Sequence, residues 1–104
     1  MHPADAFVAA VQHHQAGRFA EADRLYGTVL AAEPQHLHAL HLRGALAHAT
    51  GRNDEAVALI GRAIALDAQV PEFHYNIGVA LWALDRREEA ARHWARAVAL
   101  NGKL

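Results

Sequence analysis

Apolar and small residues recur along this chain with a period of 34 residues. Ala22, Ala56 and Ala90 lie one period apart, each directly after a glutamate. Bulky apolar residues follow these alanines at helical spacing: Tyr26, Ile60 and Trp94, then Leu30, Ile64 and Val98. Such spacing predicts amphipathic helices. A fixed period of this length is typical of stacked repeats, in which each unit buries its apolar face against its neighbours.

Each period divides into two helical stretches around a short break. The periods span roughly residues 3–36, 37–70 and 71–104, and the breaks are Ala16–Arg18, Thr50–Asn53 and Leu84–Arg87. Gly17 and Gly51 suit the left-handed conformation that ends many helices, and Asp85 takes that position in the third period. We therefore predict an all-α fold of three stacked antiparallel helix-turn-helix repeats without strands, in one domain of residues 1–104.

Small residues recur where paired helices should cross. They are Ala10, Gly44 and Gly78 on the first helices, and Ala22, Ala56 and Ala90 on the second. A glycine inside a helix costs up to ~1 kcal/mol relative to alanine. Gly44 and Gly78 therefore imply a close approach between two helix backbones.

Composition narrows the class of function. The chain contains no cysteine, which excludes disulfides and thiolate chemistry, and its formal charge of −1 gives no electrostatic reason to bind nucleic acid. The N-terminal residues lack the pattern of a signal peptide, and no stretch is long and apolar enough to span a bilayer. We expect a cytoplasmic protein that needs no cofactor and does not bind a membrane.

Candidate chemistry is sparse. The sequence has no serine, its two threonines lie on a helix face and at a break, and most carboxylates lie at helix starts, where they complement the helix dipole. We therefore predict no enzymatic activity. Nine histidines raise a metal hypothesis, since His38 and His41 can share one helix face. Glu72 is the only candidate for a third ligand, and one such candidate does not complete a coordination shell. We therefore predict no metal site.

These features together resemble the tetratricopeptide repeat family over essentially the whole chain. The positions that carry the resemblance are Ala10, Gly17, Ala22, Tyr26 and Pro34 in the first repeat, Leu40, Gly44, Gly51, Ala56, Ile60 and Ala63 in the second, and Gly78, Ala90, Trp94 and Ala97 in the third. Val29, Ala68 and Gly102 depart from the family pattern. The resemblance implies a right-handed superhelical solenoid that binds proteins or peptides. The segments Arg18–Tyr26 and Leu59–Leu66 also look like bacterial repeats that precede glycosyl-, methyl- or sulfotransferase domains.

In this family the first helix of each pair lines a concave groove. That resemblance implies a partner-binding groove of Phe7, Val11, His14, His38, His41, His48, Tyr75, Asn76, Val79 and Trp82. The alternative is that several of these side chains only pack between adjacent first helices. Asn76 is similar to the asparagine with which some members clamp a C-terminal carboxylate, but the cationic partners of that clamp are missing. We therefore expect no such clamp.

The outer edge of the third repeat is a second candidate surface. Its predicted second helix, Glu88–Leu100, is followed by only four residues, so we expect an exposed apolar edge that supports a homodimer. The edge is predicted to contain Leu81, Leu84, Ala91, Val98 and Leu100. The leading hypothesis for function is a protein-interaction module with a peptide-binding groove. The alternative is an accessory or oligomerisation module at the front of a bacterial transferase.

Overall fold

The computed structural model describes residues 1–102, and these residues form helices and no strand. The helices are α1 (Pro3–Gln15), α2 (Phe19–Ala32), α3 (Leu37–Ala49), α4 (Asn53–Leu66), α5 (Pro71–Ala83) and α6 (Arg87–Asn101). The last two residues of the predicted domain and third repeat, 103–104, lie outside the described residues. Asn53 and Arg87, predicted to belong to breaks, are the first residues of α4 and α6. A helix can begin on a polar residue, because the backbone N–H groups of its first turn have no intrahelical acceptor and are satisfied by water or by polar groups.

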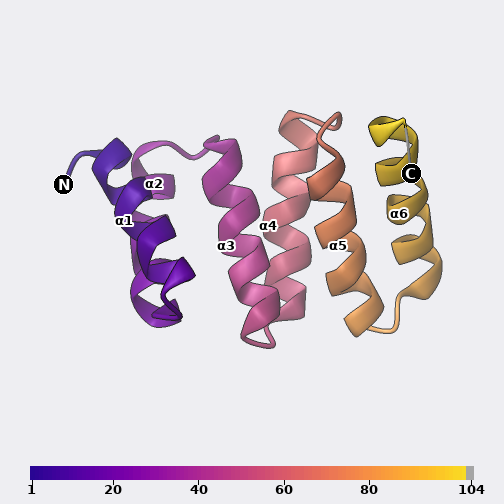
Figure 1. Ribbon diagram of the computed structural model, residues 1–104, viewed down its shortest axis with the longest axis horizontal. Helices are drawn as coiled ribbons and strands as arrows, with labels where there is room; N and C mark the ends of the chain where they lie inside the picture. Colours follow the sequence, from indigo (N-terminus) through magenta and orange to yellow (C-terminus); the bar gives the residue numbers. More distant parts are fainter. Residues whose placement is uncertain (103–104) are drawn as a thin grey trace.

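The six helices form three antiparallel pairs stacked in a row (Figure 1). Helix α1 packs on α2, α3 on α4, and α5 on α6, while α2 meets α3 and α4 meets α5 between successive pairs. The array measures 40 × 25 × 21 Å, and its ends are formed by the first and last pairs. The predicted all-α repeat solenoid is therefore confirmed.

The three breaks share one backbone geometry. Gly17, Gly51 and Asp85 all have positive φ, at 80°, 81° and 62°. The residue after each of them donates its backbone N–H to the carbonyl five residues earlier, as Arg86 does to Leu81. Glycine adopts this conformation freely, whereas Asp85 does so at a cost of about 1 kcal/mol. The break prediction was therefore correct in the third repeat as well.

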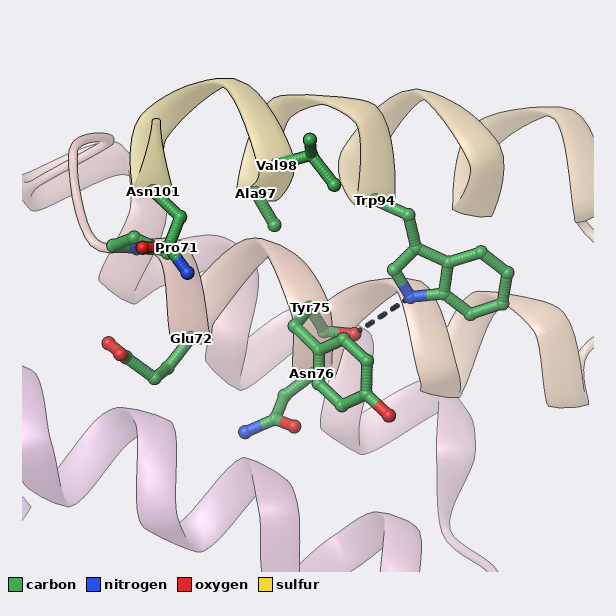
Figure 2. A pocket seen from close by; sticks show the side chains of 8 residues that line it. All are labelled: Pro71, Glu72, Tyr75, Asn76, Trp94, Ala97, Val98 and Asn101. Atoms are coloured by element: carbon green, nitrogen blue, oxygen red, sulfur yellow. Dashed lines mark hydrogen bonds between the residues drawn. The ribbon is translucent and has the colours of Figure 1, made fainter. Parts of the chain in front are cut away.

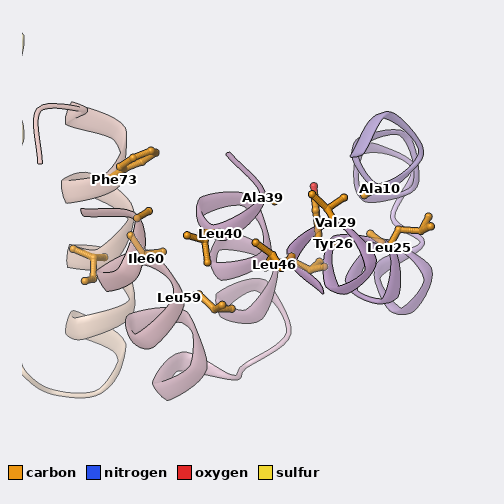
Figure 3. Packing of buried hydrophobic residues seen from close by; sticks show 14 of the residues in the cluster. Ala10, Leu25, Tyr26, Val29, Ala39, Leu40, Leu46, Leu59, Ile60 and Phe73 are labelled. Atoms are coloured by element: carbon orange, nitrogen blue, oxygen red, sulfur yellow. The ribbon is translucent and has the colours of Figure 1, made fainter. Parts of the chain in front are cut away.

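Buried apolar side chains from successive helices, among them Tyr26, Leu40 and Ile60, form the core (Figure 3). Ala22, Ala56 and Ala90 are fully buried. A Cβ atom added to Gly44 would lie 2.5 Å from Cγ1 of Ile60, and one added to Gly78 would overlap the Trp94 indole. Real Cβ atoms do not approach other heavy atoms so closely, so both glycines are required by the packing of the pair.

A polar contact ties the first repeat to the second. Asp23 on α2 accepts a hydrogen bond of 3.0 Å from Nε of Arg43 on α3, and Arg52 lies 3.7 Å from the same carboxylate. Burial opposes ionisation of Asp23, but the hydrogen bonds and charges of Arg43 and Arg52 outweigh it and lower the pKa. The carboxylate thus stays ionised at the junction at neutral pH.

The close crossing predicts the effect of enlarging Gly44. Replacing Gly44 with leucine should lower the free energy of unfolding by about 1–3 kcal/mol, because the added side chain overlaps Ile60. Urea denaturation followed by circular dichroism measures this change. Gly61 is the matched control, since a Cβ there meets nothing within 4 Å. Gly61→Leu should leave stability unchanged or raise it, and equal losses in both variants would contradict the assigned crossing.

Candidate functional site

The predicted groove residues all lie on the first helices α1, α3 and α5, but they differ in exposure. Tyr75 and Trp82 on α5 are the most open large side chains among them, at 57% and 47% exposed. His38 is also exposed. The remaining members are half-buried: Phe7, Val11, His14, His41, His48, Asn76 and Val79. The third repeat therefore contributes the open aromatic surface.

Two groove histidines, His14 and His48, are engaged by neighbouring side chains. His14 Nδ1 lies 2.9 Å from the Tyr26 hydroxyl, and His48 hydrogen-bonds Asn53. Burial lowers the pKa of His14 and raises the pKa of Tyr26 to about 12, so both groups are neutral near pH 7. These contacts support the alternative that part of the predicted set serves packing between helices.

His41 and Asn76 join the second repeat to the third. The Asn76 amide Nδ2 lies 2.6 Å from His41 Nε2, and the His41 ring packs on Phe73 with centroids 4.8 Å apart. Burial lowers the pKa of His41; the charge of His38 lowers it further, whereas Glu72 acts in the opposite direction. The neutral imidazole accepts one amide hydrogen, so Asn76 serves the repeat junction and keeps its oxygen and its second amide hydrogen for other contacts.

A hollow of about 400 Å³ lies between α5 and α6 (Figure 2). Its lining comprises Pro71, Glu72, Tyr75, Asn76, Trp94, Ala97, Val98 and Asn101. Only Tyr75 and Asn76 of the predicted groove set line it. The other groove residues are not brought together around this hollow.

The wall of this hollow is fixed by Trp94. Its indole Nε1 donates to the Tyr75 carbonyl at 3.1 Å, which holds α6 against α5 (Figure 2). The Trp94 ring also packs on Trp82, with centroids 5.5 Å apart, and the Arg87 guanidinium lies 4.8 Å above the Trp82 ring. Val98 is 43% exposed on the same wall. The floor and walls are thus apolar, with polar groups at the rim.

The 34-residue period allows the lining of the hollow to be compared with the equivalent surface of the second repeat. The residues one period before the lining belong to α3 and α4, apart from Asp67 directly after α4, and α5 packs on both helices. Ile60, for example, stands at the position of Trp94 and is fully buried. No helix among residues 1–102 covers the equivalent surface of α5 and α6. The hollow therefore lies at the position where, in the second repeat, α3 and α4 pack against the following helix α5.

The predicted edge overlaps this surface only in part. Val98 and Ala91 are exposed, and Leu84 and Leu100 are half-buried. Leu81 is 2% exposed, so the expectation that it lies open at the edge is wrong. Its helical spacing from Ile77 and Phe73 places all three on the core face of α5.

Sequence reasoning missed the contribution of Trp94 and Tyr75 to the edge. Trp94 was named only in the apolar pattern of the repeat, and Tyr75 only in the groove. The period itself carried the signal, because Ile60 and His41, one repeat earlier, are covered by α5. Positions that a following helix covers in one repeat become surface in the last described repeat.

Other kinds of site are not formed by the described residues. Within residues 1–102, no three histidine, aspartate or glutamate side chains converge as ligands of a metal ion would. None of the helices in that range has the length and hydrophobicity that a bilayer crossing requires.

Comparison with known proteins agrees with the repeat architecture. Two sequence profiles of the tetratricopeptide repeat match the chain, over residues 13–75 and residues 71–104. No curated protein matches it. A crystal structure of MamA is similar at 28% identity with a TM-score of 0.85, covering 89% of this chain and 54% of the MamA chain. This chain thus spans about half the length of that protein.

Two further solved structures share the fold at lower identity. The first TPR of Spaghetti (RPAP3), bound to the HSP90 peptide SRMEEVD, has 20% identity and a TM-score of 0.94, covering 98% of this chain and 81% of that one. The Sgt2 TPR domain from Aspergillus fumigatus has 17% identity and a TM-score of 0.91, covering 97% and 67%. Together the two profiles match nearly all of the repeats seen in the structure. This chain therefore belongs to the tetratricopeptide repeat family.

Proposed function

We propose that this chain is a non-enzymatic protein-interaction module that binds a peptide along the first helices α1, α3 and α5. The exposure of Tyr75 and Trp82 carries the proposal. These aromatic side chains lie two helical turns apart on α5, and each is about half exposed. Aromatic residues of this kind commonly supply most of the energy at protein interfaces. The peptide bound by the Spaghetti domain supports the same use of the fold.

The preferred peptide should be apolar or neutral. The HSP90 peptide of the Spaghetti complex ends in acidic residues, which cationic side chains would favour. The predicted groove set contains no lysine or arginine, and its members Phe7, Val11 and His38 carry no permanent positive charge. An aromatic or aliphatic anchor of the ligand would contact Tyr75 and Trp82 instead.

A random peptide library displayed on phage tests the groove. Peptides selected on the wild-type chain should lose about tenfold or more in affinity for Trp82→Ala and Tyr75→Ala, because an aromatic contact is removed. Fluorescence anisotropy of a labelled selected peptide gives the dissociation constants. Leu66→Ala is the matched control, since Leu66 is 43% exposed but lies on the second helix α4. Equal affinities for all four proteins would reject the groove.

The groove histidines predict a pH dependence for peptides that carry basic residues. Lowering the pH from about 7.5 to about 5.5 protonates imidazoles, and their positive charge repels such a peptide. Affinity should therefore fall as the pH falls. Burial delays this for His41, whose pKa is lowered. Wild-type affinity that stays constant over this range in the same anisotropy titration would count against the idea.

Self-association through the third repeat is a second proposal. It is supported by the hollow between α5 and α6, which stands where α3 and α4 hold the next helix. A second copy of the chain would cover Val98, Tyr75 and Trp94 through a two-fold contact, the commonest form of closed dimer. The transferase-associated alternative stays a prediction, because the described residues do not bear on it.

Sedimentation equilibrium tests the dimer. Val98→Glu should shift the chain toward monomer at concentrations where the wild type associates, because a carboxylate cannot be buried in the apolar contact. Leu66→Glu is the control, since Leu66 and Val98 are both 43% exposed. Circular dichroism should give the same helix content for all three proteins. A wild-type chain that stays monomeric at millimolar concentration, or two variants that behave alike, would contradict this proposal.

A further inference from the structure

A pair of histidines joins α5 to α6 beneath the surface of the third repeat. His74 is 5% exposed, and its Nδ1 lies 3.0 Å from Nδ1 of His93. The two rings stack with centroids 5.3 Å apart and planes inclined by 27°. On its other side, His74 Nε2 lies 2.8 Å from the backbone carbonyl of Ala68, in the connection between α4 and α5. The pair thus links three segments of the repeat.

The equivalent positions in the other repeats are apolar. One period before His74 and His93 stand Leu40 and Leu59, and a further period back stand Ala6 and Leu25. All four of these side chains are buried in the core. A buried imidazole contributes less than leucine to apolar burial and needs hydrogen-bond partners. The histidine pair in the third repeat therefore calls for an explanation other than packing.

The hydrogen bonds determine where the protons are. The Ala68 carbonyl can only accept, so His74 Nε2 carries a hydrogen and donates it. Neutral His74 then has a bare Nδ1, which accepts from Nδ1–H of His93. A first added proton can go to Nε2 of His93 without disturbing this bond. A second makes both Nδ1 atoms donors, so the link between the rings is lost.

Several ionisable groups surround the pair. Burial and the neighbouring His74 lower the pKa of His93; on α6, Glu89 acts in the opposite direction and Arg92 in the same one. Glu89 is itself held by Arg86 through two hydrogen bonds.

Two further carboxylates lie on the neighbouring elements. In the connection before α5, Asp67 accepts the Gln69 backbone N–H. On α5, Glu72 lines the hollow. Neither makes a hydrogen bond to His74 or His93 among the described contacts, so neither secures a proton on the pair.

We propose that His74 and His93 form a pH-sensitive latch that closes the third repeat at neutral pH and opens it in mild acid. The residues that follow the pair along the chain, Tyr75 and Trp94, form the wall of the hollow through their own hydrogen bond. Release of the latch therefore separates α5 from α6 at that wall. Proton uptake would therefore disrupt the packing of α5 on α6 and, with it, the wall of the hollow.

The direction of the pH effect follows from the number of protons that the linked pair can hold. The linked rings accept one added proton at most, whereas the unfolded chain can bind one on each imidazole. His93 acts in the same direction. Its pKa is lower in the folded repeat than in the unfolded chain, so the unfolded repeat binds more protons below about pH 6.5. The stability of the repeat is therefore fully present above that pH and falls as the pH is lowered through it. Because repeats contact only their neighbours, the last described pair can open while the first two stay folded.

The two tryptophans of the chain make this local opening visible. Trp82 and Trp94 both belong to the third repeat, so tryptophan fluorescence reports on that repeat alone, whereas circular dichroism reports on all helices. The wild type is titrated from about pH 8 to about pH 5 with EDTA present. The fluorescence change should come at a higher pH than the loss of helical signal. Coincident transitions would overturn the latch.

A matched variant separates the latch from general acid unfolding. His74→Leu/His93→Leu restores the pair found in the second repeat, so its early fluorescence change should disappear and its melting temperature near pH 7.5 should equal or exceed that of the wild type. His2→Asn removes an exposed imidazole from the first repeat, keeps a side chain that can cap α1, and should behave as the wild type does. A leucine pair that follows the wild-type fluorescence curve would reject the proposal.

A measurement on the wild type covers the case in which the leucine variant fails to fold. Nuclear magnetic resonance of the nitrogen-labelled imidazoles at neutral pH should find the hydrogen of His74 on Nε2 and that of His93 on Nδ1. The opposite tautomers would overturn the latch.

Discussion

The close approach of the two helices in each pair sets the geometry of the whole array. Gly44 lies against Ile60 and Gly78 against Trp94, at distances that leave no room for a β-carbon. Ala22, Ala56 and Ala90 serve the same crossings from the second helices. Once the pair is fixed in this way, each repeat presents a defined apolar surface to the next one. The stacking order, the position of the first-helix face and the hollow of the third repeat all depend on it.

Repetition explains why so much of the fold could be predicted from the sequence. A single glycine such as Gly17 is weak information, but a residue capable of positive φ at the same phase of three periods indicates a break each time. Even Asp85, which departs from glycine, was interpreted correctly through its phase. The same reasoning located the small residues of the crossings. The bounds of α4 and α6 differed by a residue because polar residues can start a helix before the apolar pattern begins.

The functional surface was less predictable because it depends on which side chains a neighbouring repeat covers. Tyr75 and Trp82 were correctly placed on the first helix. The exposure of Tyr75, however, comes from the absence of a further described helix beside α5, since His41, one repeat earlier, packs on Phe73. Asn76 was expected to face a ligand, but its amide nitrogen is bound by His41 across the repeat junction. The contact of His74 with His93 was not predicted at all. Only a position-by-position comparison with Leu40 and Leu59 makes that pair conspicuous.

The two junctions of the array differ in their electrostatic character. Asp23 meets Arg43 and Arg52 between the first and second repeats, so that junction contains charges of opposite sign, partly open to solvent. Between the second and third repeats, His41 and Asn76 form an uncharged polar contact. Dissolved salt screens the first kind of contact and leaves the second almost untouched. Raising the ionic strength would therefore weaken the junction between the first and second repeats and leave the junction between the second and third almost unchanged.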